Sequence, residues 1–462
     1  MAPRSDQELS ELWNTLGRKH RQACSEQISD YYAGKRKNVQ AGEDPRDKDL
    51  AAEVLERVRE LNRRGDWQRA RPLFDPAWDP LRHLLEDNGQ DLSFVTVLGS
   101  DHYLLRFGTG WEEAELLRVD GHEIAHLAGV IACSLSSNRR FFAAAYKGRG
   151  IAVREGFGGP LLTEIPWPGP EARIPKGLPP EIHQNWSRRE GAPKISDFRL
   201  SDDGKRMLVV ALGEGVLLAD ARQEPAVWRL LMPDYTCIDP LEVLLESTKR
   251  RKPLFSASVD GLHADLSPDG AFVGLGQHDS EHYLLALDSR DGAYCRKIAP
   301  HWEYPHLVRF SGDSRQAAFN SCFYHDGMTG LLELPSAEDP ATRESDPQFP
   351  IIDPSLKVHA ATCLPPEATN TGSSAFVLAG AGWMKCVTPA GDVLWDHFFG
   401  STASSLDYCS RTNTLLLGSF SGFLHVLDVG TEAEPGREIG HRPRKERKRW
   451  IFWRDEDAPL QW

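Results

Sequence analysis

The chain has 462 residues, of which 40% are hydrophobic, and a formal net charge of −13. This length exceeds one ordinary hydrophobic core and suits an array of repeated units with an appendage. The negative charge argues against nucleic acid binding over the whole surface, although it leaves a local basic patch open.

The sequence contains no apolar run long enough for a transmembrane helix, and its polar start lacks the apolar segment of a signal peptide. Eight cysteines are scattered without Cys-x-x-Cys spacing, and several lie in strand-like stretches, which is typical of reduced, buried thiols. We therefore expect a cytoplasmic protein without a disulfide framework and without a membrane contact.

Residues 1–90 are expected to form a helical region. Ser5 and Glu8 have capping-box spacing, and apolar residues follow at helical intervals. A second helix is predicted over residues 47–64 and a short third over 80–85. The charged faces of these helices are typical of solvated surface, and a partner-binding face is the alternative.

A strand-turn-strand pattern recurs in the rest of the chain. It is clearest over residues 266–288, where a Ser-Pro-Asp-Gly turn follows one apolar run and precedes others, and it returns over 198–220 and 308–334. Tight turns favour Asp, Gly, Asn and Ser, and buried strands favour short apolar runs. A single sheet of this kind cannot bury both faces, so several must pack radially. The sequence predicts a mainly β fold, a β-propeller of about seven blades over residues 92–440.

The pattern resembles the WD-repeat propellers. The Trp-Asp dipeptide that ends the third strand of such repeats is replaced here by Ala219-Asp220, Leu287-Asp288 and Leu427-Asp428. Gly121-His122 matches the Gly-His that opens them. This resemblance implies the fold without a partner or an activity. The general arrangement, a diverged propeller after a helical region, is also similar to bacterial propellers that accompany MoxR-type ATPases and von Willebrand A-domain proteins. No single motif carries that second likeness, which implies such a system as the partner.

The first blade is expected to be incomplete. Only three strands precede the next unit, over residues 94–98, 103–107 and 114–119. We expect residues 450–453 of the C-terminal tail (441–462) to close the ring by joining that sheet, because this would remove the free edges. The basic run over 442–449 has two interpretations. It is either a surface that contacts nucleic acid or an acidic partner, or a solvated segment that leads to the closing strand or to a tail packed on the ring. We favour the solvated segment. Trp462 suggests that the tail is docked.

Two insertions are expected within the blades. Residues 156–194 are rich in Pro and Gly and should lack regular structure. The second insertion, residues 223–260, contains a predicted helix at 239–251 with Asp at its cap and Pro in its first turn. Its short apolar stripe is expected to pack on the propeller, and a presented partner helix is the alternative.

His122-Glu123-Ile124-Ala125-His126 fits the H-E-x-x-H spacing of zinc hydrolases. On a helix the two His share one face and can hold zinc while the Glu activates water. Here the motif follows a turn and leads directly into an expected strand, which leaves little room for a helix. We therefore favour a plain connection between blades and keep zinc binding by His122 and His126 as the alternative.

Several polar and aromatic residues fall in loops that open on one face of a propeller. The matching loops of the fourth and fifth blades and the connection between those blades contribute His278, Asp279, Glu281, His282, Tyr324, His325, Asp326, His301, Trp302, Glu303 and Tyr304. We call this set the loop face. Such residues can bind a divalent metal, a polar small molecule or a peptide, and ordinary polar loops are the alternative.

The sequence shows no nucleophile elbow, phosphate-binding loop or dinucleotide fingerprint, so we assign no catalytic residue and no cofactor. We predict a non-enzymatic interaction or scaffold module that binds other proteins, as a subunit or adaptor of a larger assembly. The alternative is an enzyme or ligand-binding protein with a metal site on the loop face or a zinc hydrolase site at His122 and His126.

Overall fold

A computed structural model describes most of the chain, namely residues 4–39, 42–85, 90–108, 114–168, 192–212, 215–232, 262–278, 281–288, 294–298, 302–334 and 349–462. The chain divides into two compact units. The first unit comprises Met1–Thr109, Leu117–Ala125 and His359–Trp462, and the second comprises Gly110–Leu116 and His126–Val358. The helix predicted over 239–251 lies outside the described residues.

The helical region precedes the first strand, as expected. Its elements are α1 (Asp6–Tyr32), α2 (Lys48–Arg63), η1 (Trp67–Arg69), α3 (Ala70–Leu73) and η2 (Leu81–Leu84). The capping box is confirmed, because Ser5 Oγ accepts from the Glu8 amide at 3.3 Å while the Glu8 carboxylate accepts from the Ser5 amide. Asp47 caps α2 by accepting from the Leu50 amide at 2.9 Å. Among the described residues, no helix is both long and apolar enough to cross a bilayer.

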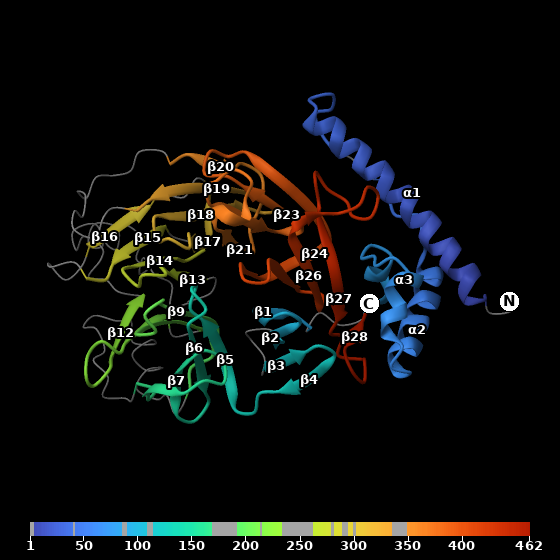
Figure 1. Cartoon of the computed structure of the whole chain (residues 1–462). Helices are drawn as coiled ribbons and strands as arrows, with labels where there is room; N and C mark the ends of the chain where they lie inside the picture. The colour runs from blue at the N-terminus through green and yellow to red at the C-terminus, as the bar shows by residue number, and fades with distance from the viewer. Residues whose placement is uncertain are drawn as a thin grey trace, which may run out of the picture. The chain divides into compact units, whose positions relative to one another are not determined.

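Four sheets follow one another in the second unit, and each is a four-stranded antiparallel meander (Figure 1). The first of the four consists of β5 (Val130–Leu135), β6 (Phe141–Tyr146), β7 (Gly150–Glu155) and β8 (Leu161–Ile165), and the second of β9 (Ile195–Leu200), β10 (Arg206–Ala211), β11 (Gly215–Asp220) and β12 (Val227–Met232). The third consists of β13 (His263–Leu266), β14 (Phe272–Gly276), β15 (His282–Ala286) and β16 (Tyr294–Ile298). The fourth consists of β17 (Tyr304–Phe310), β18 (Gln316–Phe323), β19 (Asp326–Glu333) and β20 (Ile351–Asp353).

The remaining strands belong largely to the first unit. One sheet consists of β1 (Leu92–Gly99), β2 (His102–Phe107), β3 (Glu115–Asp120) and β4 (Glu123–His126). The other has eight strands, which are β21 (Ala360–Leu364), β22 (Ala375–Ala379), β23 (Ala381–Val387), β24 (Val393–Cys409), β25 (Thr414–Ser419), β26 (Phe423–Glu432), β27 (Arg444–Ile451) and β28 (Leu460–Gln461). The 17-residue β24 pairs with β23 over its first part and with β25 over its second, so this eight-stranded sheet is two meanders. The described residues thus contain seven blade-like sheets, and the predicted mainly β fold is confirmed.

Each central sheet is apolar on both faces. In β10, Met207 and Val209 join a core shared with the β5–β8 sheet, whereas Leu208 and Val210 join a core shared with the β13–β16 sheet. Successive side chains of a strand point to opposite faces, so one apolar run supplies two cores. This explains why the strands read as continuous apolar runs rather than as alternating ones.

Buried carboxylates also connect neighbouring sheets. Asp265 of β13 accepts from the Phe310 amide of β17 at 2.9 Å and pairs with Arg199. In the first unit, Asp407 of β24 accepts from the Val97 amide of β1 at 2.8 Å. The last full meander therefore packs directly against the first sheet.

The expected closure by a shared strand is wrong. The first sheet is complete, because β4 is its fourth strand. Trp450 and Ile451 lie in β27, which pairs with β26 on one side and with β28 on the other. The first and last sheets are joined by face-to-face packing of complete sheets instead.

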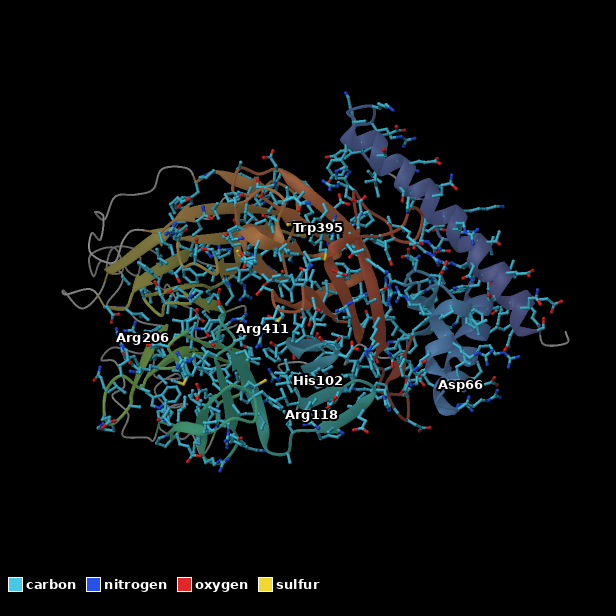
Figure 2. All side chains as sticks on the ribbon, in the orientation of Figure 1. Asp66, His102, Arg118, Arg206, Trp395 and Arg411 are labelled. Atoms are coloured by element: carbon cyan, nitrogen blue, oxygen red, sulfur yellow. The ribbon has the colours of Figure 1, made fainter. Side chains whose placement is uncertain are left out.

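The basic run is also not a solvated approach, because it forms β27 itself. Its burial alternates, and Arg444 and Glu446 are buried while Lys445 between them is exposed. The Arg444 guanidinium lies 5.5 Å from the centre of the Trp395 ring, which Figure 2 labels within this sheet. A strand of mostly charged residues is therefore tolerated because its inward side chains have partners.

Glu446 is the centre of this buried ionic group. Its carboxylate accepts from Arg449 at 2.9 Å through each oxygen and from His425 Nδ1 at 2.8 Å. Arg71 of the helical region donates to the same carboxylate at 3.3 Å. Burial alone would raise the pKa of Glu446, but the charges of Arg449 and Arg71 hold it well below its usual value.

Parts of the two expected insertions are regular structure. β8 begins inside the segment that was expected to lack it and pairs with β7. Likewise β12, at the start of the second insertion, pairs with β11. Both are outer strands of their sheets, and both contain apolar residues that the Pro- and Gly-rich or helix-like surroundings concealed.

The helical region packs against the end of the last sheet (Figure 1). Trp462 is 2% exposed, its indole donates to the Phe74 carbonyl at 2.7 Å, and its ring centre lies 6.3 Å from that of Trp13. The expected docking of the tail is confirmed, and its partner is the helical region.

We expect Trp462→Ala to lower the free energy of unfolding of the first unit by about 3 to 5 kcal/mol, because it leaves a large cavity between the helices and β28. Chemical denaturation followed by circular dichroism measures this loss. Phe420→Ala, at a ring that is 42% exposed, is the control and should cost much less. Equal losses in the two variants would contradict the docking.

We expect Asp265→Ala to destabilise the second unit by about 2 kcal/mol, because the Phe310 amide and the Arg199 guanidinium lose a buried acceptor. Thermal and urea unfolding measure the effect. The control is Glu164→Ala, which removes an exposed pair whose atoms are 3.9 Å apart. A change no larger than that of the control would rule out this role for Asp265.

Candidate interaction face

The loop face lies in the second unit, around the ends of β14, β15, β17 and β18. Asp279 and His301 lie outside the described residues. Among the others, the structure brings the aromatic members together and places His282 in the interior. The loop face therefore has two parts, an outer aromatic one and an inner hydrogen-bonded one.

Four aromatic rings form the outer part. His278 stacks on Tyr304 with ring centres 4.5 Å apart and planes 4° apart. Tyr304 is followed by Phe323 at 6.3 Å, and Phe323 meets Tyr324 edge to face at 4.5 Å. We call these four residues the aromatic ladder. Phe323 was missed in the sequence because it ends an apolar strand and reads as core.

Tyr324 occupies the most prominent position of the ladder. It is 73% exposed and sits at the tip of the hairpin between β18 and β19, where Phe323 pairs with Asp326. Its φ of 52° is a left-handed conformation that residues with a side chain adopt at a cost. The strand pairing on both sides holds this conformation, so the ring is presented on a rigid support.

His282 belongs to the interior. It is 1% exposed, and its Nε2 lies 3.1 Å from the Asn320 carbonyl oxygen, so Nε2 carries the proton. Its Nδ1 then accepts from His263 Nε2 at 3.3 Å. A side chain at Gly276 would meet both imidazoles at 3.1 Å or less, which explains glycine at this strand end. Because both ring nitrogens are engaged, His282 is structural rather than a metal ligand.

Asn320 fixes the strand beneath the ladder. Its amide group donates to Thr329 Oγ1 at 2.9 Å and to the Leu356 carbonyl at 3.0 Å, and its oxygen accepts from the Val358 amide at 3.1 Å. Buried and fully engaged polar side chains restrict a strand to one arrangement. The ladder therefore stands on a rigid base.

The remaining members of the loop face surround the ladder. The Trp302 amide donates to Ser321 Oγ at 3.2 Å. Glu303, His325 and Asp326 are exposed, and Glu281 is half-buried. Acidic and aromatic groups thus share one edge of the β17–β20 sheet.

The helical zinc arrangement expected as an alternative at His122 and His126 is wrong. Glu123–His126 form strand β4 and His122 lies in the turn before it, so the two imidazoles do not share the face of a helix. His122 stacks near Trp67, with ring centres 6.0 Å apart, and His126 pairs with Glu115 at 3.2 Å. The two imidazoles serve separate contacts.

Within the described ranges, a single group of His, Cys, Asp and Glu side chains has the spacing of metal ligands, and it is not on the loop face. It consists of His20, Asp44 and Asp79 in the helical region. No pattern along the sequence indicates this group, because the three residues come from segments that are brought together only by tertiary packing.

The successive meanders with two buried faces place the chain among mainly β proteins built from propeller-type sheets. No family model matches the sequence, and no curated protein matches it. Among solved structures, the β-propeller domain of Cps50 (Swd1) from Myceliophteria thermophila is similar at 12% identity and a TM-score of 0.44, over 71% of this chain and 93% of that chain.

We expect acid to destabilise the second unit through His306, beside the ladder. Burial, together with the charges of Lys357 and His278, lowers the pKa of His306 to about 4, while its Nδ1 lies 2.7 Å from the Val358 carbonyl. Unfolded histidine titrates near ~6.5, so the unfolded chain binds a proton that the folded chain does not between these values. Stability is therefore present above pH ~6.5 and lost as the pH falls toward about 4.

The measurement is the free energy of unfolding as a function of pH. The slope of this free energy against pH gives the number of protons taken up on unfolding, and His306→Gln should reduce that number by up to one between pH ~6.5 and about 4. His325→Gln, at an exposed site, should leave the slope unchanged. An unchanged slope in His306→Gln would show that other groups cause the acid sensitivity.

Proposed function

We propose that this chain is a non-enzymatic protein-interaction module that binds a protein partner through the aromatic ladder. The observation that carries the proposal is the exposure of Tyr324 on a hairpin whose conformation is fixed from below. Exposed aromatic rings on rigid supports lose little conformational entropy on binding, and Tyr is enriched among the residues that dominate binding energies. The carboxylates of Glu303 and Asp326, and the Lys357 ammonium that lies 3.2 Å from the Tyr324 carbonyl oxygen, favour a partner with charges of both signs around an apolar centre.

A narrower form of the proposal concerns the partner and the compartment. An ATPase or von Willebrand A-domain system is the candidate partner, supported by the general resemblance of the chain alone. We propose a cytoplasmic location, in line with the free thiols of the six described cysteine side chains.

A photo-crosslinking amino acid at position 324 tests the proposal in cells that express the chain naturally. We expect one discrete protein adduct that is absent when the crosslinker replaces Tyr31, an aromatic residue on α1 that is 45% exposed. The adduct partner is then purified and titrated against the full chain. Tyr324→Ala should weaken its binding at least about tenfold, and Tyr31→Ala should leave it unchanged. Equal binding by both variants would exclude the ladder as the interface.

A further inference from the structure

The helical region brings three potential metal ligands together from separate segments. His20 lies on α1, Asp44 lies between α1 and α2, and Asp79 lies between α3 and η2. One donor atom from each lies within 4.8 Å of the donor atoms of the other two. All three residues belong to the first unit, so their arrangement is internal to one compact body.

Of these three residues, His20 is buried and Asp44 and Asp79 are half-buried. His20 is 9% exposed, and its Nε2 lies 3.7 Å from Cys24 Sγ, one helical turn further along α1. Burial, helped by the nearby carboxylates, raises the pKa of the Cys24 thiol to about 11, so this thiol is neutral. The anionic donors of the group are the two carboxylates.

Arg46 orients one of these carboxylates. Its Nη2 lies 2.6 Å from Asp44 Oδ2, and its Nε donates to Asp44 Oδ1 at 2.9 Å. The guanidinium is itself held 4.4 Å from the centre of the Trp13 ring. Gly17 makes room for it, because a side chain there would lie 2.6 Å from Arg46 Nη1. A ligating carboxylate that is fixed by an outer hydrogen-bond donor is the usual construction of a metal site.

Two carboxylates and an imidazole face the same space. Arg46 is bound to Asp44, while Asp79 faces the same space from the segment after α3. A cation placed between the carboxylates of Asp44 and Asp79 would be attracted by both.

We propose that His20, Asp44 and Asp79 bind a divalent transition-metal ion that ties α1 to the segments before α2 and η2. A nitrogen donor with two carboxylate oxygens suits Zn²⁺ and its first-row neighbours, whereas Mg²⁺ and Ca²⁺ favour oxygen donors alone. Ligand atoms about 2.0 to 2.2 Å from a tetrahedral Zn²⁺ ion are about 3.4 Å apart, so the three side chains would have to draw closer if they start at the limit of 4.8 Å. Three protein ligands leave a fourth position for water.

This site is independent of the aromatic ladder and of the proposed interaction. Its role is to strengthen the packing of the helical region, because the ion would add to contacts that already join these segments, such as the hydrogen bond from the Trp13 indole to the Asp75 carbonyl at 2.8 Å. Metal binding to the folded state alone raises stability by mass action.

The test is metal binding by the tag-free full chain after chelator treatment and dialysis. Zn²⁺ alone is the probe, its stoichiometry is measured by elemental analysis after equilibrium dialysis, and the melting temperature is recorded with and without the ion. We expect binding of a single tight equivalent with a rise in melting temperature. Asp79→Asn and His20→Asn should each weaken this binding at least tenfold and abolish the rise.

Matched controls separate this site from adventitious binding. Asp66→Asn changes an exposed carboxylate of the same region, labelled in Figure 2, and His126→Ala removes an exposed imidazole; both should bind Zn²⁺ as the unaltered chain does. If His20→Asn fails to fold, Asp79→Asn decides, because it preserves the shape and removes only the charge. The proposal is overturned if the unaltered chain takes up no tight equivalent, or if Asp79→Asn binds Zn²⁺ as tightly as Asp66→Asn.

Discussion

The structure depends on one constraint, which is that most of its sheets are apolar on both faces. A four-stranded meander such as β9–β12 cannot remain stable with either face in water, so each sheet requires a neighbour on each side. The side chains of β10 show the result, because alternate residues enter two different cores. Buried acceptors such as Asp265 and Asp407 then connect backbone amides of neighbouring sheets and fix how those sheets face each other. The helical region follows the same rule, since it covers apolar residues at the end of the last sheet.

The elements that were predicted correctly are those whose cause is local. In the turn after β13, Ser267 donates to Asp269 and accepts from the Phe272 amide, so the segment from Ser267 to Phe272 contains its own hydrogen bonds. The same interactions recur at Ser201 and Ser311. Turn residues flanked by apolar runs therefore identify the inner strands, and the capping box at Ser5 identifies the start of α1 for the same reason.

The features that the sequence did not indicate depend on distant partners. β4 is polar and exposed, so its residues give no apolar period, and the segment was expected to be a plain connection between blades rather than a strand. β27 is a run of charges whose inward members are buried only because groups such as His425 and Arg71 meet Glu446. The aromatic ladder was foreseen in part, since topology places loops on one face, but Phe323 reads as core. The donors around His20 were not foreseen, because no spacing along the chain connects them.

The long strand β24 has a consequence for how the chain can be cut and rejoined. The connection between β20 and β21, by contrast, lies outside the strands, where new termini or inserted domains are expected to be tolerated. At β24 the backbone runs from one meander into the next within a single strand, and its two parts pair with β23 and β25. A circular permutant opened between β20 and β21 keeps all of its strand pairing. One opened within β24 loses part of the pairing with β23 or with β25. These two meanders are therefore inherited, transplanted or lost as a single block.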